Sequence, residues 1–459
     1  MKKTILQEAS IKYREEALAN LKKFVAIDTV MDLKSASESS PFGTGVRQGL
    51  DFVADLGRKL GFNVDYCSHY VTELSLGTGP VIDVYCHADV VPVSKNWKTD
   101  PFKVTIDSNN KMYGRGVSDD KGPGMASLYG IKMLSDLGYI NGYKVRMIFG
   151  GNEENGSAGL EAYFHKLKKG YPSYGISPDG DYPLIYAEKG IFTYKASYDL
   201  FIPGLTNFHF GQATNIVLDE VKLKLKGVTD LEAKVAKFDM ENEDIRVFLA
   251  EGEIVFKGKA AHGSIPWEGV NAGLYALKFM SEVLNIPVLE NIFNDYNDGR
   301  GTAFDGNYPS KYFDGASYNI GKISYEDGKL TLVCNMRLPE NVGPEEACTN
   351  IANKTKAKIE LIGGSPALIN DPKSPFIQEL LKAYVEQTGD TESKPLAIGG
   401  GTYARDSKNS VAFGCTFPGR DPKMHQDDEV FSLEDFYASI YIVAAAVDKL
   451  GKLAIRESK

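Results

Sequence analysis

Apolar positions follow two different spacings in the first part of the chain. The stretches "PVIDVYCH" and "KVRMIFGG" are almost continuously apolar and short, as buried strands are. In "ALANLKKFVAI" and "SLYGIKMLSDLG" the apolar positions recur at the spacing of an amphipathic helix. Because strand-like and helix-like stretches alternate, residues 1–190 are predicted to form an α/β domain with a largely parallel sheet.

The pattern changes after residue 190. Strand-like stretches such as "IFTYKASYDLF" and "KLTLVCNMRLP" are interspersed with helical ones such as "EGVNAGLYALKFMSEVL", which indicates an α+β segment. Long amphipathic helices return in "SPFIQELLKAYVEQTG" and near the C-terminus. The sequence therefore predicts one domain made of residues 1–190 and 369–459, interrupted by an inserted domain of residues 191–368.

Composition and charge exclude several classes of protein. With 459 residues, 43% hydrophobic and 25% charged, the chain has the composition of a folded globular protein. Its formal net charge of -9 argues against nucleic acid or an anionic membrane as the main partner, since both attract basic surfaces. The longest strongly apolar run, Ile440 to Val447, is too short to span a bilayer.

The N-terminal residues and the cysteines bear on location. The first residues contain two lysines but no apolar run, so they are predicted to form an amphipathic helix and not a signal peptide. Five cysteines are scattered without the C-x-x-C spacing, which is typical of free thiols in a reducing compartment. We therefore expect a cytoplasmic protein.

Two adjacent glutamates, Glu153 and Glu154, follow the apolar stretch "RMIFGG". In a regular strand they would point to opposite faces, so only one could serve a given site. Gly150 and Gly151 are expected to end the strand first, and Ser157 is expected to cap a following helix. Both carboxylates then lie in a loop at the carboxyl end of a strand, where open α/β sheets bind ligands.

Further imidazoles and carboxylates follow other predicted strands and turns. Taken singly, each has an ordinary structural explanation, such as a polar strand end or an acidic turn. Together, two imidazoles and three carboxylates could hold two divalent cations, one carboxylate bridging them, which leaves one glutamate of the pair for proton transfer. The candidates outside the pair are His87, Asp89, Asp119, Asp120, Asp179 and His425.

Five motifs carry a resemblance to a known family. "HADVVP", "GRGVSDDKGP", "NEENGS", "SPDGDYP" and "MHQDDE" occur in this order between residues 87 and 429. They resemble the motifs of the co-catalytic zinc peptidases and deacylases, which include carboxypeptidase G, acetylornithine deacetylase and the PepV-type (Xaa-His) dipeptidases. "SPDGDYPLIYAEKG" and "IGGGTYAR" are similar to the PepV-type branch in particular.

The resemblance implies a fold and a di-metal site. The fold would be a phosphorylase/hydrolase-like α/β catalytic domain with a central mixed sheet, interrupted by an α+β lid domain of two lobes. Zinc is the expected metal, with manganese or cobalt as alternatives. His87, Asp119 and Asp179 would bind one ion. Asp119, Glu154 and His425 would bind the other.

The resemblance also implies roles for residues that do not bind metal. Glu153 would be the general acid/base, Asp89 would support His87, and the peptide bond between Asp119 and Asp120 would be cis. In the inserted domain, His262 would stabilise the oxyanion. Asn215, Arg337 and the backbone of Gly399, Gly400 and Gly401 would bind the substrate, the last four at its carboxylate. The enlarged lid resembles that of the PepV-type enzymes and implies a monomer.

These residues lead to a functional hypothesis. We expect a metal-dependent dipeptidase that hydrolyses dipeptides with a free N-terminus, using a metal-bridging water and Glu153 as the general base. An N-acyl-amino-acid deacylase or a carboxypeptidase of the same superfamily is the alternative that the metal motifs alone leave open. A binding protein that has lost catalysis would lack ligands or base, and all six residues are present.

Overall fold

The computed structural model describes residues 3–202 and 204–459 and divides into two compact units. The first unit runs to Ala187 and resumes in Asn370–Leu396 and Thr402–Lys459. The second unit comprises Glu188–Ile369 and Ala397–Gly401, so that a short segment near the C-terminal part of the chain belongs to it. The assignment of the units as catalytic and lid domains stays a prediction.

The largest sheet has nine strands in the order β1-β2-β6-β3-β7-β20-β9-β18, with β19 paired to β9. Its central strands β6, β3, β7 and β20 are parallel, while β1, β2 and β9 join antiparallel. The sheet is therefore mixed, as the resemblance implied. The strands are β1 (Asn63–Asp65), β2 (Val71–Gly77), β3 (Val81–His87), β6 (Lys144–Gly150), β7 (Tyr174–Ser177), β9 (Ile185–Glu188), β18 (Leu368–Ile369), β19 (Leu396–Ile398) and β20 (Ser410–Ala412).

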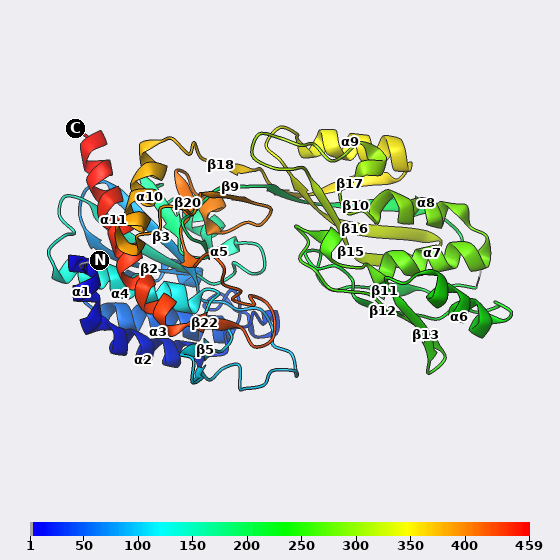
Figure 1. Ribbon diagram of the computed structural model, residues 1–459, viewed down its shortest axis with the longest axis horizontal. Coiled ribbons are helices and arrows are strands. Elements are labelled where there is room, and N and C mark those ends of the chain that lie inside the picture. The colour runs from blue at the N-terminus through cyan, green and yellow to red at the C-terminus, as the bar shows by residue number, and fades with distance from the viewer. Residues whose placement is uncertain (1–2, 203) are drawn as a thin grey trace. The chain divides into compact units, whose positions relative to one another are not determined.

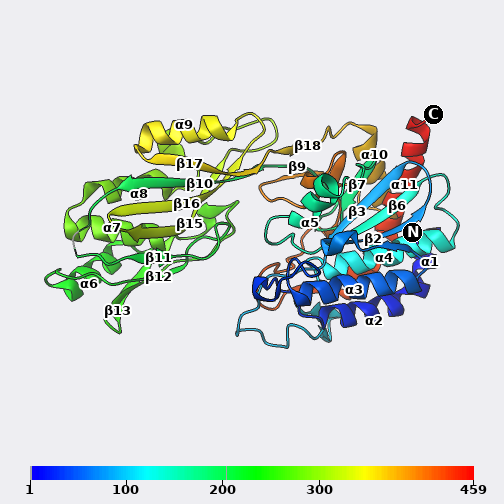
Figure 2. The ribbon, with the colours of Figure 1, turned by 180° about the vertical axis from the view of Figure 1, so that it is seen from behind.

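Helices α4 and α11 lie in front of this sheet in Figure 1, and the view from behind in Figure 2 shows β2, β3 and β6 in front of them. The two helices pack closely because Gly130 on α4 lacks a side chain: a Cβ there would lie 2.4 Å from the carbonyl oxygen of Ile440. The helices of the first unit are α1 (Ile5–Ser10), α2 (Arg14–Val25), α3 (Thr44–Lys59), α4 (Lys121–Asp136), α5 (Ala158–Glu161), α10 (Pro375–Thr388) and α11 (Leu433–Glu457).

The N-terminal residues are helical, as the sequence predicted, but a break divides them into two α-helices. A 3-10 turn, Ile11–Tyr13, separates α1 from α2. The hydroxyl of Ser10 donates to the carbonyl oxygen of Gln7 at 2.8 Å. Such a local bond offers the backbone an alternative to the regular helical pattern, which explains the break.

The second unit is an α+β structure with its own hydrophobic core. It contains a five-stranded antiparallel sheet in the order β11-β15-β16-β10-β17 and a three-stranded sheet in the order β12-β14-β13. Its strands are β10 (Gly190–Asp199), β11 (Phe208–Phe210), β12 (Glu220–Leu223), β13 (Arg246–Ala250), β14 (Glu253–Lys257), β15 (Ser317–Glu326), β16 (Lys329–Leu338) and β17 (Lys358–Ser365). Its helices are α6 (Leu231–Glu241), α7 (Ala272–Leu284), α8 (Pro287–Tyr296) and α9 (Pro344–Thr355).

The register of the parallel strands sets the position of the candidate site. Strand β3 pairs with β6 up to His87 opposite Gly150, and it pairs with β7 on its other side. The loops that follow these three strands therefore leave from the same edge of the sheet. Two smaller sheets complete the first unit: β4 (Thr105–Ile106), β5 (Lys111–Tyr113) and β22 (Val430–Ser432) form one, and β8 (Gly180–Asp181) pairs with β21 (Cys415–Thr416) in the other.

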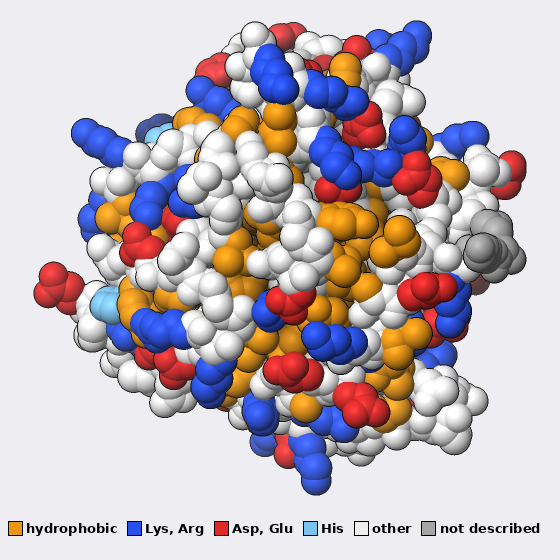
Figure 3. Space-filling view, turned by 90° about the vertical axis from the view of Figure 1, so that its left-hand side faces the viewer, with side chains coloured by type: hydrophobic (Ala, Val, Ile, Leu, Met, Phe, Trp, Pro, Cys, Tyr) orange, Lys and Arg blue, Asp and Glu red, His pale blue; other side chains and the backbone are white. Residues whose placement is uncertain are grey.

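The distribution of charged side chains and the state of the cysteines can be compared with the expectations from composition. On the face shown in Figure 3, Lys and Arg side chains are interspersed with Asp and Glu around a central area of hydrophobic side chains. All five cysteines are buried free thiols. Within the described part of the chain, no helix combines the length and the apolar character needed to cross a bilayer.

Candidate active site

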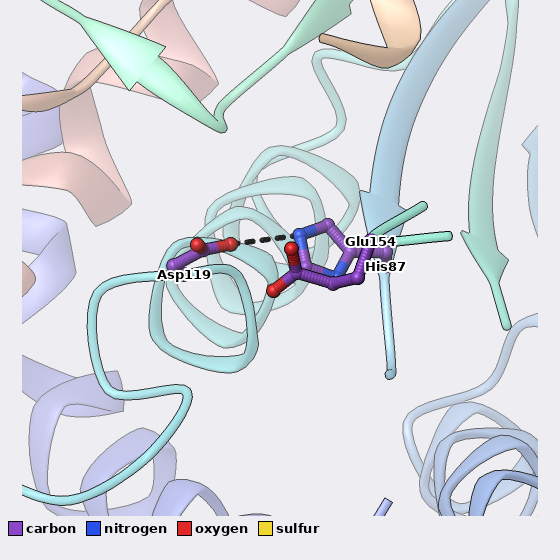
Figure 4. A group of neighbouring side chains, drawn as sticks. All are labelled: His87, Asp119 and Glu154. Atoms are coloured by element: carbon purple, nitrogen blue, oxygen red, sulfur yellow. Dashed lines mark hydrogen bonds and ion pairs between the residues drawn. The ribbon is translucent and has the colours of Figure 1, made fainter. Parts of the chain in front are cut away.

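The carboxyl ends of β3 and β6 bring three candidate ligands together (Figure 4). His87 is the last residue of β3, Asp119 lies just before α4, and Glu154 follows β6. Nε2 of His87 lies 2.9 Å from Oδ1 of Asp119. One ligand atom from each of the three residues lies within 4.8 Å of the other two. This spacing suits a shared metal ion.

Asp119 lies between two imidazoles. Its Oδ1 atom faces His87, and its Oδ2 atom lies 2.9 Å from Nε2 of His425. His425 comes from the loop before β22 and also lies 3.0 Å from Oε2 of Glu154. One carboxylate therefore offers one oxygen to each side of the cluster, which is the arrangement that a bridging ligand requires.

A second group of possible ligands shares His87 with the first. Atoms of His87, Glu153 and Asp179 lie within 4.8 Å of one another. Asp179 sits between β7 and β8, with Oδ2 3.6 Å from Nε2 of His87. Geometry alone would allow either glutamate to be a ligand, since each belongs to one group.

Asp89 fixes the loop that carries both glutamates. Its carboxylate accepts the backbone N–H of Glu153 at 3.1 Å and that of Glu154 at 3.2 Å. Its backbone carbonyl oxygen lies 2.9 Å from Nδ1 of His87. Because a carbonyl oxygen only accepts, Nδ1 carries a hydrogen, and in the neutral ring Nε2 then presents its lone pair toward Asp119. That tautomer suits a metal ligand.

Burial and the repulsion between neighbouring carboxylates raise the pKa values of both glutamates. Burial raises the pKa of Glu153 well above its ordinary value, and the carboxylates of Asp179 and Glu154 raise it further, while His87 opposes them. Burial, followed by the charge of Asp119, raises the pKa of Glu154 to about 7. Crowded, poorly solvated carboxylates of this kind are stabilised by cations, which supports the fit of a metal site.

The pKa of the His425 imidazole is also raised, although burial acts on it with the opposite sign. Burial alone would lower its pKa, but hydrogen bonds and charge from Asp119 and Glu154 raise it to about 11. The cluster as a whole offers carboxylate oxygens and imidazole nitrogens without a thiolate. This donor set fits Zn, Mn or Co, because imidazole and carboxylate both suit these ions.

The expectation that Ser157 caps the helix after the Glu153–Glu154 loop is wrong. Both glutamates do lie beyond the end of β6, but Ser157 makes no side-chain cap on α5 because its backbone is left-handed, with φ of 60°. The carboxamide of Asn152 accepts the N–H of Ala158 at 3.0 Å instead.

The peptide bond between Asp119 and Asp120 is cis, as expected.

Three further residues contact the cluster: Asp120, which was a candidate from the sequence without an assigned role, and Tyr403 and Glu429, which were not candidates. Asp120 accepts the backbone N–H of His87 at 3.0 Å, and the ring of Tyr403 meets the ring of His87 edge to face, with centroids 6.2 Å apart. Glu429 accepts the backbone N–H of Asp119 at 3.2 Å. Glu429 and Tyr403 lie in the quoted motifs "MHQDDE" and "GGGTYAR", which are the only sequence signal for them.

The remaining candidates form a cluster inside the second unit. Gly263, next to His262, donates its N–H to the carbonyl oxygen of Asn215 at 2.7 Å. Nη1 of Arg337 donates to the carbonyl oxygen of Gly399 at 3.2 Å. Gly399 in turn lies against Ser264, whose hydroxyl is 2.7 Å from Nδ1 of His262. Gly400 and Gly401 continue the same segment.

Known proteins are similar to this chain in sequence or in fold. A "Putative dipeptidase" of Staphylococcus haemolyticus is 33% identical over 463 residues, covering 94% of this chain and 97% of that protein. Among solved structures, the dipeptidase Dug1p of Saccharomyces cerevisiae has a TM-score of 0.61 at 16% identity, covering 97% of this chain and 98% of that one. Human carnosine dipeptidase 1 has a TM-score of 0.58 at 15% identity, covering 97% and 99%.

A mixed-sheet α/β unit with a buried carboxylate and imidazole cluster defines a hydrolase of the metallopeptidase class. The model of peptidase family M20/M25/M40 matches residues 84–449, which span the whole cluster from His87 to His425. The chain belongs to this family.

Proposed function

We propose that this hydrolase is a dipeptidase that cleaves the peptide bond of dipeptides with a free N-terminus. The single observation that carries the chemistry is Asp119, whose two carboxylate oxygens each lie 2.9 Å from a different imidazole. The name of the Staphylococcus relative supports the substrate class, because the similarity extends over 94% of this chain.

Two divalent ions, with zinc as the expected metal and manganese or cobalt as alternatives, would complete the centre. His87, Asp119 and Asp179 would hold one ion, and Asp119, Glu154 and His425 the other. When bound, such ions polarise a carbonyl and make water more acidic. Glu154 is the proposed ligand of the glutamate pair because its Oε2 lies 3.0 Å from His425.

Glu153 is then left for proton transfer. Its raised pKa, which arises from burial and from the neighbouring carboxylates, makes it a better proton acceptor than an ordinary glutamate. It would take a proton from the attacking water and return it to the leaving amine. Asp89 would keep Glu153 in place by accepting the N–H of its backbone at 3.1 Å.

The second unit would supply substrate binding. We propose that His262 donates to the oxyanion and that Arg337 pairs with the C-terminal carboxylate of the dipeptide, since its planar guanidinium suits a carboxylate. Asn215 and the backbone of Gly399, Gly400 and Gly401 would complete the binding of the substrate.

The test is digestion of one mixed panel of dipeptides, tripeptides and N-acetyl amino acids, followed by mass spectrometry, with Zn, Mn, Co or a chelator present. We expect only the dipeptides to disappear, and the chelator to stop the reaction. Loss of the acylated substrates would move the protein to the deacylases. No loss with any metal would contradict the proposal.

We also propose that the protein acts as a monomer in the cytoplasm, where its five free thiols would stay reduced. Light scattering should then give a mass near 50.4 kDa for the chain in solution. Twice that mass would contradict the proposal of a monomer.

A further inference from the structure

Glu429 is wholly buried and receives donors from four positions of the loop before α4, Arg115, Gly116, Ser118 and Asp119. All of these donors except the Arg115 guanidinium are backbone N–H groups or a hydroxyl. Its Oε1 atom accepts the N–H of Ser118 at 2.8 Å, the hydroxyl of Ser118 at 3.0 Å and the N–H of Asp119 at 3.2 Å. An ionised carboxylate only accepts hydrogen bonds, and every group that faces this one donates.

The second oxygen of Glu429 completes the arrangement. Nη1 of Arg115 donates to Oε2 at 2.8 Å, and this guanidinium is itself only 3% exposed. The N–H of Gly116 lies 3.1 Å from both oxygens. The loop from Arg115 to Asp119 is therefore wrapped around one side chain, and its path depends on that side chain.

Glu429 also joins the two segments that carry candidate ligands. It follows His425 along the chain, and its backbone carbonyl accepts the N–H of Gly114 at 3.3 Å. Strand pairing continues from there, with Val430 opposite Tyr113. The segment with His425 and the loop with Asp119 thus meet at Glu429.

We propose that Glu429 is a positioning residue for the metal centre. By fixing the backbone on the N-terminal side of Asp119, it keeps the Asp119 carboxylate at bonding distance from both imidazoles. On the other side, Asp120 holds the backbone of His87 at 3.0 Å. The inference rests on the proposed function, because it takes Asp119 and His425 as metal ligands.

The test compares Glu429→Gln with Asp83→Asn in the full-length protein. Glutamine keeps the volume of Glu429, but its amide N–H₂ would face groups that also donate. Asp83 is the matched control: it is wholly buried, and its carboxylate accepts two bonds from Arg146 at 2.7 Å each, away from the cluster. Both substitutions are expected to reduce stability, so stability does not distinguish a positioning role from a merely structural one. Only the loss of a positioning residue is expected to weaken metal binding.

Two quantities are measured: the Kd for zinc, by competition with a chromophoric chelator, and the Tm of the metal-free protein. We expect Glu429→Gln to weaken zinc binding about 10-fold or more, the range found for groups that orient ligands. The Kd of Asp83→Asn should stay within about twofold of the wild-type value. Both variants should lower the Tm. In turnover, Glu429→Gln should lower kcat more than it changes KM.

Ser118→Ala provides a milder second variant, because it removes only the hydroxyl donor at 3.0 Å. It should weaken zinc binding by about threefold, less than Glu429→Gln, and it carries the test if that variant does not fold. If Glu429→Gln or Ser118→Ala folds and binds zinc as tightly as the wild-type protein, the inference is overturned. It is also overturned if Asp83→Asn weakens zinc binding equally. Neither result would contradict the proposed function. A wild-type protein that binds none of zinc, manganese and cobalt would overturn the proposed function and this inference with it.

Discussion

Oδ2 of Asp119 lies 2.9 Å from Nε2 of His425, although the residues of the second unit separate the two in the sequence. His425 reaches Asp119 from the loop before β22, while Asp119 precedes α4. The contact joins the first and the last of the three sequence segments of the first unit. Both parts of the second unit, residues 188–369 and 397–401, lie between these two segments in the sequence.

Removal of metal should destabilise the protein through Asp119. A ligand that binds only the folded state at about 100 times its Kd adds roughly 3 kcal/mol of stability. We expect EDTA to lower the Tm of the wild-type protein, and Asp119→Asn to show less than about half of that shift because it weakens both proposed sites. Differential scanning fluorimetry with and without EDTA measures this.

The control for this prediction is Asp83→Asn, which lacks a buried ion-pair partner of Arg146 but keeps the cluster. It should start from a lower Tm and still show the full EDTA shift. An undiminished shift in Asp119→Asn would mean that Asp119 does not bind the ions.

Asp89 should influence the rate without being a metal ligand. Asparagine at this position could accept only one of the two N–H groups that the carboxylate now accepts, those of Glu153 and Glu154. An unsatisfied buried donor costs about 1–3 kcal/mol, so kcat should fall roughly 10-fold in Asp89→Asn. Metal content, measured by mass spectrometry, should stay at the wild-type value. An unchanged kcat would show that the loop does not depend on Asp89.

Arg337 should determine affinity for the substrate carboxylate. A hydrogen bond between charged groups contributes about 1.5–3 kcal/mol, so Arg337→Ala should raise KM roughly 10- to 100-fold for dipeptides. Dipeptide amides lack the carboxylate and serve as the internal comparison, because wild type and variant should cleave them with similar KM. Equal losses on both substrates would mean that Arg337 acts in some other way.

The sequence predicted which candidate residues lie at the ends of strands better than it predicted the contacts that hold these residues in place. Gly150 and Gly151 correctly predicted that Glu153 and Glu154 lie in a loop, because glycines interrupt an apolar strand. The recurrence of imidazoles and carboxylates after strands correctly predicted that His87 and Glu154 lie together, since the parallel strands β3 and β6 end at one edge of the sheet. Asp119 joins them from the loop before α4.

Contacts that depend on the tertiary structure could not be predicted from the sequence pattern. Ser157 was expected to be the helix cap from its residue type, but its backbone conformation leaves that role to Asn152. The bonds of Glu429 reach Arg115 and Ser118, which lie far away in the sequence. No local spacing signals such a pairing, and an acidic residue in a polar loop more often faces solvent.

The most direct test of the proposed mechanism is Glu153→Gln, measured for turnover and for bound metal in the same preparation. Glutamine has nearly the same shape but cannot accept the proton, and general acid–base catalysis contributes about 100- to 10,000-fold. We expect kcat on a dipeptide to fall at least about 100-fold with the full metal content retained. Substantial residual turnover, or loss of metal from this variant while Glu154→Gln keeps it, would contradict the assignment of Glu153 as the base.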